Sequence, residues 1–282
     1  MNTPYIVIEN IVRAALLEDL GHGHDITTRL TIPNDKQCRS VLRTREQGVL
    51  AGLSAALSAF TLTNPNFEME ILARDGDIIE AGQDIAIITG SAQATLIAER
   101  TALNLLSHMS GIASLTHKYV AEIQGTNAKI CDTRKTLANL RALQKYAVRM
   151  GGGHNHRFGL DDAILIKDNH IAIAGGIEQA LKSAINNASH TVKIEIEVDN
   201  LKQLEEVLKI GGANIIMLDN FCITDLKTAV NMIDGRAVTE ASGGISLSTV
   251  REISQSGVSY ISVGALTHSA PALDIGLDVG IL

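Results

Sequence analysis

The sequence predicts an α/β fold whose larger part is a parallel barrel, and three observations support this. After residue 125, short apolar segments recur at intervals of about 20 to 35 residues, each followed by a helical stretch. Each segment ends near a charged residue or a glycine, which favours a barrel because barrel active sites lie at the carboxyl ends of the strands. Only 3% of residues are aromatic and tryptophan is absent, so the core is aliphatic, as in strands buried on both faces.

Six such segments can be read along the chain. In order they are AKICDTRK, DAILIKDN, VKIEIEVDN, ANIIMLDN, RAVTEASGG and SYISVGA, and their terminal positions are Asp132, Lys167, Glu197, Asp219, Glu240 and Gly264. One strand-helix unit per segment indicates a barrel that is complete or slightly short of eight strands.

The N-terminal part of the chain has a different pattern of apolar and polar residues. Residues 5–20 have the pattern of an amphipathic helix that ends at Gly21. Residues 40–52 indicate strands around a turn at Gly48, and residues 67–90 alternate apolar and polar positions between glycine turns. This alternation predicts short β-hairpins.

A long helix is expected next, with Ser91 as its cap and Gly111 as a break or a bend and a domain junction. Arg100 falls four residues after Leu96 and three before Leu103, on their apolar face. Spacing leaves two interpretations open: an arginine whose stem lies along apolar surface with its head in water, or one with a functional contact.

Composition excludes several classes of function. Lys and Arg number 24 against 31 Asp and Glu, a net charge of -7, which argues against a general nucleic-acid binder. The cysteines, Cys38, Cys131 and Cys222, fit neither a disulfide framework nor a zinc site. The first 20 residues do not resemble a signal peptide, and no stretch is apolar enough to span a membrane. We therefore expect a cytoplasmic protein without a membrane partner.

Residues 132–171 concentrate cations around a run of three glycines. The segment contains Arg134, Lys135, Arg141, Lys145, Arg149, Arg157 and Lys167, with His154, His156 and His170. In an acidic protein, such a local cluster indicates a small anionic ligand. Guanidinium groups match carboxylates and phosphates, whereas the surrounding positive charge disfavours a metal at the two nearby histidines. A solvated basic face suits Lys145 and Arg149, which are four apart on a helix expected over residues 139–150.

Acidic strand ends and glycine loops complete the expected site. Glu197 and Asp219 each close a strongly apolar strand, where a carboxylate can hold Mg²⁺, a sugar hydroxyl or a developing positive charge. For Asp199 and Asn220, capping of the next helix is an equal alternative.

The loops ASGGIS and SVGALTHS, residues 241–246 and 262–269, follow the last two strands. Glycine loops there form the usual phosphate site of a barrel, and plain turns are the alternative. The residues alone thus predict a barrel-mouth site for a ligand with several negative groups.

Eight blocks of the sequence resemble the quinolinate phosphoribosyltransferase family. They are EDLGHGHDITT, ERTALNLLSHMSGIAS, DTRKT, KYAVRMGGGHNHRFGLDDAILIKDNHI, EIEVDN, IIMLDNF, EASGGIS and VGALTHSAPALDIGLD, in register from residue 18 to 278. The resemblance implies a type II phosphoribosyltransferase fold. An N-terminal α/β sandwich, residues 1–110 with the tail 270–282, is followed by an incomplete α/β barrel of about seven strands, residues 111–269.

The resemblance also implies an activity. Members of this family transfer phosphoribosyl from phosphoribosyl pyrophosphate to quinolinate with Mg²⁺, releasing pyrophosphate and CO₂ and giving nicotinate mononucleotide for NAD biosynthesis. It implies a homodimer in which one subunit's N-terminal domain caps the other's barrel. Two alternatives remain: a phosphoribosyltransferase of the same fold with another substrate, and a non-catalytic anion-binding barrel that would lack the strand-end acids.

The family's functional residues can be placed on this chain through the matching motifs. For the quinolinate carboxylates these are Arg134, His156 and Arg157, with Arg100 from the partner subunit. For the phosphoribosyl donor and the chemistry they are Lys135, Lys167, Glu197 and Asp219, the two acids also being the implied Mg²⁺ ligands. For the 5′-phosphate they are Ser242, Gly243, Gly244, Gly264 and His268.

The chain departs from the family pattern at one point. Where the family has Pro-Gly after the TRKT motif, this chain has Ala138 and Asn139. The change bears on the geometry of the loop, because glycine adopts positive φ freely and asparagine is only tolerated there.

Overall fold

The computed structural model describes residues 4–281, and these form two compact units. The first unit consists of residues 4–117, 136–152 and 266–281, and the second of residues 118–135 and 153–265. The domain boundary expected near residue 110 stays a prediction.

The first unit contains an antiparallel sheet and most of the long helices. Its helices are α1 (Tyr5–Leu20), α2 (Ile26–Thr31), α3 (Leu53–Thr63), most of α4 (Ala92–Glu122), α5 (Arg141–Met150) and nearly all of α11 (Ala265–His268). Its strands are β1 (Gln37–Thr44), β2 (Gly48–Val49), β3 (Glu68–Ile71), β4 (Ile78–Ile79), β5 (Asp84–Ser91) and β12 (Ile275–Ile281). As expected, α1 ends at Gly21.

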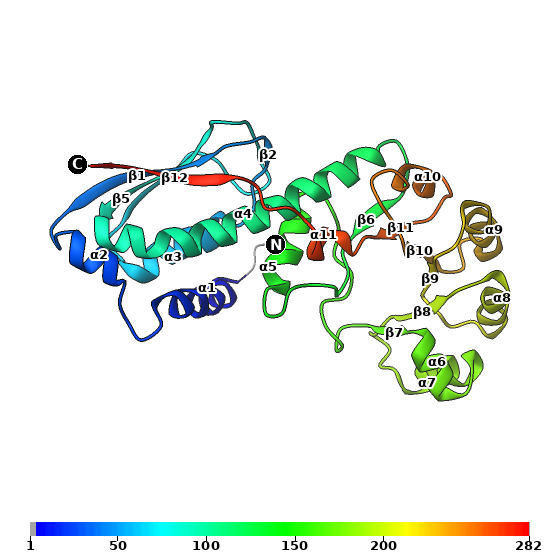
Figure 1. Ribbon diagram of the computed structural model, residues 1–282. Coiled ribbons are helices and arrows are strands. Elements are labelled where there is room, and N and C mark those ends of the chain that lie inside the picture. Colours follow the sequence, from blue (N-terminus) through cyan, green and yellow to red (C-terminus); the bar gives the residue numbers. More distant parts are fainter. Residues whose placement is uncertain (1–3, 282) are drawn as a thin grey trace. The chain divides into compact units, whose positions relative to one another are not determined.

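The main sheet of this unit has the order β12-β1-β5-β3, and its ladders are antiparallel; β12, β1 and β5 are labelled in Figure 1. Along β1, buried Cys38, Ser40, Leu42 and Thr44 alternate with more exposed residues, so one face of the sheet lies on the core. Gly48 does not form the expected turn. It lies in β2, which pairs with β4, and a side chain there would meet Leu273 and Ser114 at 2.6 Å.

Helix α4 runs through Gly111 without a break, and a bend at this residue stays a prediction. The glycine is needed for packing, since a Cβ at this position would lie 1.9 Å from the carbonyl oxygen of Pro271. At the start of α4 the expected cap is present, because the Ser91 hydroxyl accepts a hydrogen bond from the Ala94 N–H at 3.3 Å. Among the helices described for residues 4–281, none has the length and apolar character needed to cross a membrane.

The second unit is built from alternating strands and helices. Its strands are β6 (Lys129–Cys131), β7 (Ile164–Ile166), β8 (Ile194–Val198), β9 (Ile215–Asp219), β10 (Val238–Ser242) and β11 (Tyr260–Ser262). Its helices, besides the end of α4, are α6 (Asp168–Ala174), α7 (Ile177–Asn187), α8 (Leu201–Ile210), α9 (Ile223–Ile233) and α10 (Val250–Ser254).

The six strands form one parallel sheet in the order β6-β11-β10-β9-β8-β7 (Figure 1), which confirms the predicted class and all six predicted strands. A seventh position is an isolated parallel bridge between Cys131 and His154. No ladder among the described residues joins this bridge to β7, so the barrel is incomplete there. Every residue of β8 is buried, as expected for a strand covered on both faces.

Candidate active site

A cavity of about 510 Å³ lies at the carboxyl ends of the parallel strands in the second unit. Its lining residues are Thr133, Arg134, Lys135, His156, Arg157, Leu165, Lys167, Glu197, Met217, Asp219, Ser242 and Ser262. Eight of the residues to which the sequence assigned a role therefore share one cavity, and all of them belong to the same unit. Ligands of barrel proteins bind at this end of the strands.

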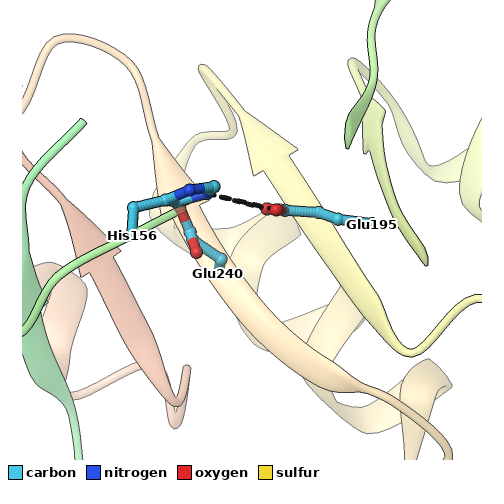
Figure 2. Close-up of side chains that lie close together, drawn as sticks. All are labelled: His156, Glu195 and Glu240. Carbon is cyan, nitrogen blue, oxygen red and sulfur yellow. Dashed lines mark hydrogen bonds and ion pairs between the residues drawn. The ribbon is translucent and has the colours of Figure 1, made fainter. Parts of the chain in front are cut away.

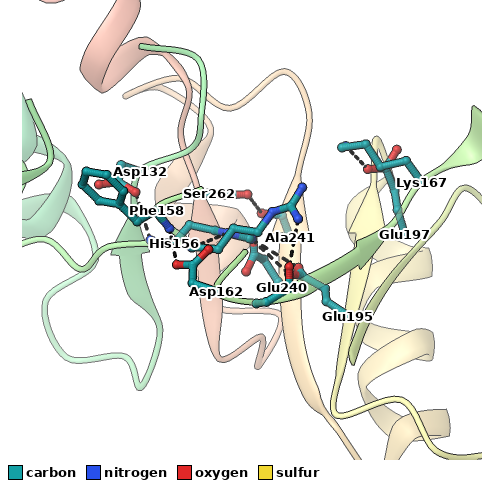
Figure 3. A network of polar contacts seen from close by, with 12 residues as sticks. Asp132, His156, Phe158, Asp162, Lys167, Glu195, Glu197, Glu240, Ala241 and Ser262 are labelled. Atoms are coloured by element: carbon teal, nitrogen blue, oxygen red, sulfur yellow. Dashed lines mark hydrogen bonds and ion pairs between the residues drawn. The ribbon is translucent and has the colours of Figure 1, made fainter. Parts of the chain in front are cut away.

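Lys167 and Glu197 form an ion pair at this mouth (Figure 3). Lys167 follows β7 and is the N-cap of α6. Glu197 is the penultimate residue of the neighbouring strand β8, in which Ile196 pairs with Ile166. The Glu197 side chain is 9% exposed and that of Lys167 is 44% exposed. The acid therefore holds an accessible ammonium group at the cavity.

Three carboxylates can converge beside this pair. One oxygen each of Glu197, Asp199 and Asp219 lies within 4.8 Å of the others. Asp199 does not cap α8, because the N-cap is Asn200, whose side chain accepts from the Gln203 N–H. A set of carboxylate oxygens fits a hard cation such as Mg²⁺. The sequence named Glu197 and Asp219 as metal ligands and left the role of Asp199 open.

Two guanidinium groups line the same cavity. Arg157 donates a hydrogen bond from Nη1 to the Ala163 carbonyl at 2.9 Å, and its buried Nε finds no hydrogen-bond partner among the described residues. Burial, and then the like charge of Arg134, lower the pKa of Arg157, while Glu195 and Asp162 partly oppose this. Two like charges held together in a partly buried position favour an anionic ligand.

The backbone that presents His156 and Arg157 is held by Asp132, a buried residue after β6. Its carboxylate accepts hydrogen bonds from the His156 N–H at 2.9 Å and from the Asn155 side chain at 2.6 Å. His154 points elsewhere, with its ring edge-to-face against Tyr260. Asp132 therefore fixes the segment between the glycine run and β7.

His156 itself turns toward two buried acids (Figure 2). Its Nε2 lies 3.1 Å from a carboxylate oxygen of Glu195 and 3.5 Å from one of Glu240. Burial, and then the charge of Glu195, raise the pKa of Glu240 to about 7. The sequence analysis did not assign these two acids to the site. For Glu195 alone a signal was available, since Glu195 and Glu197 are alternate residues of one apolar strand and therefore share a face.

The glycine loop after β10 packs against the end of β9. Gly243 has φ +91°, and a Cβ there would lie 2.2 Å from the Asn220 side-chain oxygen. The Asn220 N–H also bonds the Ser242 carbonyl at 2.9 Å. The expected helix N-terminus is not adjacent, because α10 begins only at Val250. Gly244 has φ +61° and faces open space.

Some residues assigned from the sequence lie outside the cavity lining. Gly264 directly precedes α11. His268, exposed in α11, and Arg100, exposed in α4, belong to the first unit. His170 accepts a hydrogen bond from the Lys167 N–H at 2.9 Å, which supports the start of α6.

Two residues of helix α5, Lys145 and Arg149, and Asn139 just before it can be compared with the expectations from the sequence. Lys145 is 1% exposed, so its assignment to a solvated face is wrong. Arg149 lies over the ring of Tyr146, 5.5 Å from its centroid. Asn139 has φ +64°, so the asparagine in this chain adopts the left-handed region that glycine reaches freely.

Comparison with known proteins adds a second line of support. Residues 25–110 match the N-terminal domain of quinolinate phosphoribosyl transferase, and residues 112–278 match its C-terminal domain. The chain is 46% identical over 273 residues to a nicotinate-nucleotide pyrophosphorylase (carboxylating) of Mycobacterium leprae, covering 95% of each protein. It is 41% identical to a probable nicotinate-nucleotide pyrophosphorylase (carboxylating) of Bacillus subtilis, covering 98% of this chain and 94% of that protein.

A solved structure gives the same relationship. NadC from Streptococcus pyogenes is 39% identical and superimposes with a TM-score of 0.95, covering 100% of this chain and 99% of that one.

Proposed function

The chain belongs to the quinolinate phosphoribosyltransferase family, and we propose that its barrel-mouth cavity joins quinolinate to phosphoribosyl pyrophosphate. The products are nicotinate mononucleotide, pyrophosphate and CO₂, a step of NAD biosynthesis. The observation that supports this most is the composition of the cavity wall. Arg134 and Arg157 come from the segments after β6 and before β7, while carboxylates end β8 and β9.

Arg134, His156 and Arg157 form the dicarboxylate subsite in this proposal. Guanidinium groups bind carboxylates through two parallel hydrogen bonds, which fixes the plane of the pyridine ring. Burial of Arg157 supports this role, because an anion restores the solvation that its guanidinium group lost on folding.

The donor occupies the rest of the cavity. Lys135 and Lys167 contact its phosphate groups and the reacting centre, and Glu197 and Asp219 contact the ribose hydroxyls. The open backbone at Ser242, Gly243 and Gly244 holds the 5′-phosphate, together with Gly264. Backbone N–H groups can approach a phosphate closely where no side chain intervenes, and Gly244 faces open space.

The chemistry follows from these charges. The pyridine nitrogen forms a bond to the anomeric carbon as the bond to pyrophosphate breaks, through a state with positive charge on the ribose ring. The Glu197 and Asp219 carboxylates stabilise that charge. The carbon–carbon bond to the carboxylate beside the ring nitrogen then breaks and releases CO₂. Its electron pair stays on the ring carbon next to the cationic nitrogen, where Lys167 can stabilise it, and this carbon then takes up a proton from solvent to give nicotinate mononucleotide.

Mg²⁺ is the proposed cofactor. Glu197 and Asp219 would hold it, with Asp199 as a further carboxylate, since one oxygen of each lies within 4.8 Å of the others. When bound, Mg²⁺ offsets the charge of the pyrophosphate leaving group.

We further propose a homodimer in which Arg100 reaches the cavity of the partner subunit. This would explain why an arginine lies exposed on α4 beside Leu96, which is itself 36% exposed. A cytoplasmic location is also proposed. Three free cysteines, two of them buried, are typical of a reducing compartment.

An assay with quinolinate, phosphoribosyl pyrophosphate and Mg²⁺ tests the function. We expect pyrophosphate and nicotinate mononucleotide in equal amounts. Turnover with nicotinate but not with quinolinate would favour a related phosphoribosyltransferase. Binding of both ligands without turnover would favour the non-catalytic barrel, although the retained Glu197 and Asp219 argue against it.

A further inference from the structure

A second cavity, of about 540 Å³, lies in the same barrel. Its lining includes Lys193, Ile215, Val238 and Tyr260, which lie at or next to the first residues of β8, β9, β10 and β11. It is therefore at the amino-terminal end of the strands, opposite the mouth. Two residues, His156 and Arg157, line both cavities.

The acids that face this inner cavity are Glu195 and Glu240, which are 2% and 4% exposed. They come from β8 and β10, on either side of β9, where Glu240 pairs with Met217. The His156 ring points at Glu195, as Figure 2 shows, with Nε2 at 3.1 Å from one Glu195 oxygen and at 3.4 Å from the other. One carboxylate oxygen of Glu240 is buried without a hydrogen-bond partner among the described residues.

The other ring nitrogen of His156 is also engaged. Nδ1 accepts a hydrogen bond from the backbone N–H of Arg157 at 2.7 Å. An atom that accepts from an N–H carries a lone pair, so in the neutral ring the proton is on Nε2, which faces the acids. The ring thus connects the buried carboxylates to the backbone of Arg157.

A metal ion is the alternative ligand for this cluster, since one atom each of His156, Glu195 and Glu240 lies within 4.8 Å of the others. A histidine that binds a metal through Nε2 normally donates Nδ1–H to an acceptor. Here Nδ1 faces a donor, the Arg157 N–H. The hydrogen-bond pattern therefore favours a proton on Nε2 over a metal.

We propose that Glu195 and Glu240 are positioning residues that hold His156 in its Nε2–H tautomer and thereby set the orientation of Arg157 at the dicarboxylate subsite. Glu195 accepts from Nε2–H, and Nδ1 holds the Arg157 backbone. The guanidinium group is then fixed at its far end by the Ala163 carbonyl at 2.9 Å. This role rests on the proposed function, because it assigns the acids to the quinolinate half of the reaction only.

Electrostatics agree with a positioning role. Bringing two charged carboxylates together in the protein interior is costly. Accordingly, burial and, second, the negative charge of Glu195 raise the pKa of Glu240. The other groups that act on Glu240 are His156, the Ser262 hydroxyl and Asp132. The pair can therefore keep a proton and still direct one carboxylate at Nε2.

Two substitutions of Glu195 distinguish a role in positioning His156 from a general contribution to the stability of the fold. Glu195→Leu removes the acceptor for Nε2–H, and Glu195→Gln keeps an acceptor oxygen of the same shape. We expect Glu195→Leu to raise the KM for quinolinate by at least about tenfold and to change the KM for phosphoribosyl pyrophosphate less than about twofold. Glu195→Gln should restore most of the quinolinate KM. Glu206→Gln, an exposed acid on α8, is the matched control and should change neither KM.

A spectroscopic measurement reads the tautomer without turnover. In protein labelled with ¹⁵N-histidine, the His156 signals, assigned by their loss in His156→Gln, should show Nδ1 as a lone pair and Nε2 as N–H. This pattern should change in Glu195→Leu.

Three results would overturn the proposal. These are an unchanged quinolinate KM in Glu195→Leu, equal increases in both KM values, and a proton on Nδ1 of wild-type His156. Stoichiometric binding of added Zn²⁺ or Mn²⁺ that is lost in Glu240→Gln would replace it with a metal site. If the wild type does not turn over quinolinate, the proposed function is wrong. The histidine spectrum needs no turnover, so it still tests whether His156 carries its proton on Nε2.

Discussion

Lys167 and Glu197 join the ends of two neighbouring parallel strands through an ion pair. The acid is nearly buried and the lysine is partly exposed, so the ammonium group is held at the cavity rather than left to move in solvent. Because a positioned cation acts on the charge that develops during the reaction, we expect the loss of Lys167 to reduce catalysis more than it reduces the stability of the fold.

Lys167→Met should lower kcat/KM at least about a hundredfold. The free energy of unfolding should fall by only about 1–3 kcal/mol, because the nearly buried Glu197 carboxylate loses its ion-pair partner. Steady-state kinetics and urea unfolding measure the two effects.

Lys182→Met is the matched control, since it removes a lysine from an exposed Lys–Glu pair on α7 and should leave both quantities unchanged. Retention of activity in Lys167→Met would remove this lysine from the reaction.

Glu240 predicts a pH dependence of stability. Its pKa in the folded protein is raised from 4.5 to about 7, so between these values the folded state binds more protons than the unfolded state. Stability from this group is therefore complete below pH 4.5 and is lost as the pH rises through about 7.

Glu240→Gln cannot titrate and should lack this loss. Relative to the wild type, the variant should gain on the order of 1–3 kcal/mol in the free energy of unfolding between pH 5 and pH 8. Urea unfolding at several pH values measures the difference. A difference that does not depend on pH would show that Glu240 titrates normally.

The positive φ of Asn139 predicts that substitutions at this position change the stability of the protein through backbone strain. At φ +64° most L-residues are strained by their Cβ. Glycine has no Cβ, and asparagine tolerates the region better than other residues do. Asn139→Ala should lower the free energy of unfolding by about 1 kcal/mol, and Asn139→Gly should change it by less than about 0.5 kcal/mol.

Asn231→Ala, at an exposed site within α9, serves as the control and should not destabilise the protein. Equal effects of alanine and glycine at position 139 would mean that φ at this residue does not matter.

Arg100 predicts complementation between subunits. If Arg100 acts on the partner's cavity, Arg100→Ala should inactivate a dimer that still forms. Mixing it with Lys167→Met should then restore activity, because one site of each mixed dimer is intact, to about a quarter of the wild-type value. Size-exclusion chromatography checks assembly. Mixtures that stay inactive, or an active Arg100→Ala enzyme, would place Arg100 outside the reaction.

Much of the fold and the mouth of the site follow from local pattern. The six parallel strands were predicted because each is a short apolar run with a polar end, and runs of this kind depend little on distant contacts. The carboxyl ends of parallel strands lie at one edge of the sheet. The strand pattern therefore also predicted that Lys167, Glu197 and Asp219 lie close together, and they line one cavity.

The contacts of His156 with Glu195 and Glu240 could not be predicted from the sequence, because they depend on the order of the strands in the sheet. His156 meets Glu195 and Glu240 only because β8 and β10 flank β9 in the sheet, with a fixed register. Lys145 was misjudged for a similar reason. A charge four residues from Arg149 looks like a solvent-facing row, but burial is decided by what packs on that face, and Lys145 is 1% exposed.

The most direct test of the central claim is the fate of the carboxylate beside the pyridine nitrogen. Quinolinate labelled with ¹³C in that carboxylate would be incubated with the enzyme, phosphoribosyl pyrophosphate and Mg²⁺, and ¹³CO₂ and pyrophosphate would be measured together. The account predicts one labelled CO₂ for each pyrophosphate and none without the phosphoribosyl donor. Pyrophosphate release without labelled CO₂, or no release of either, would contradict it.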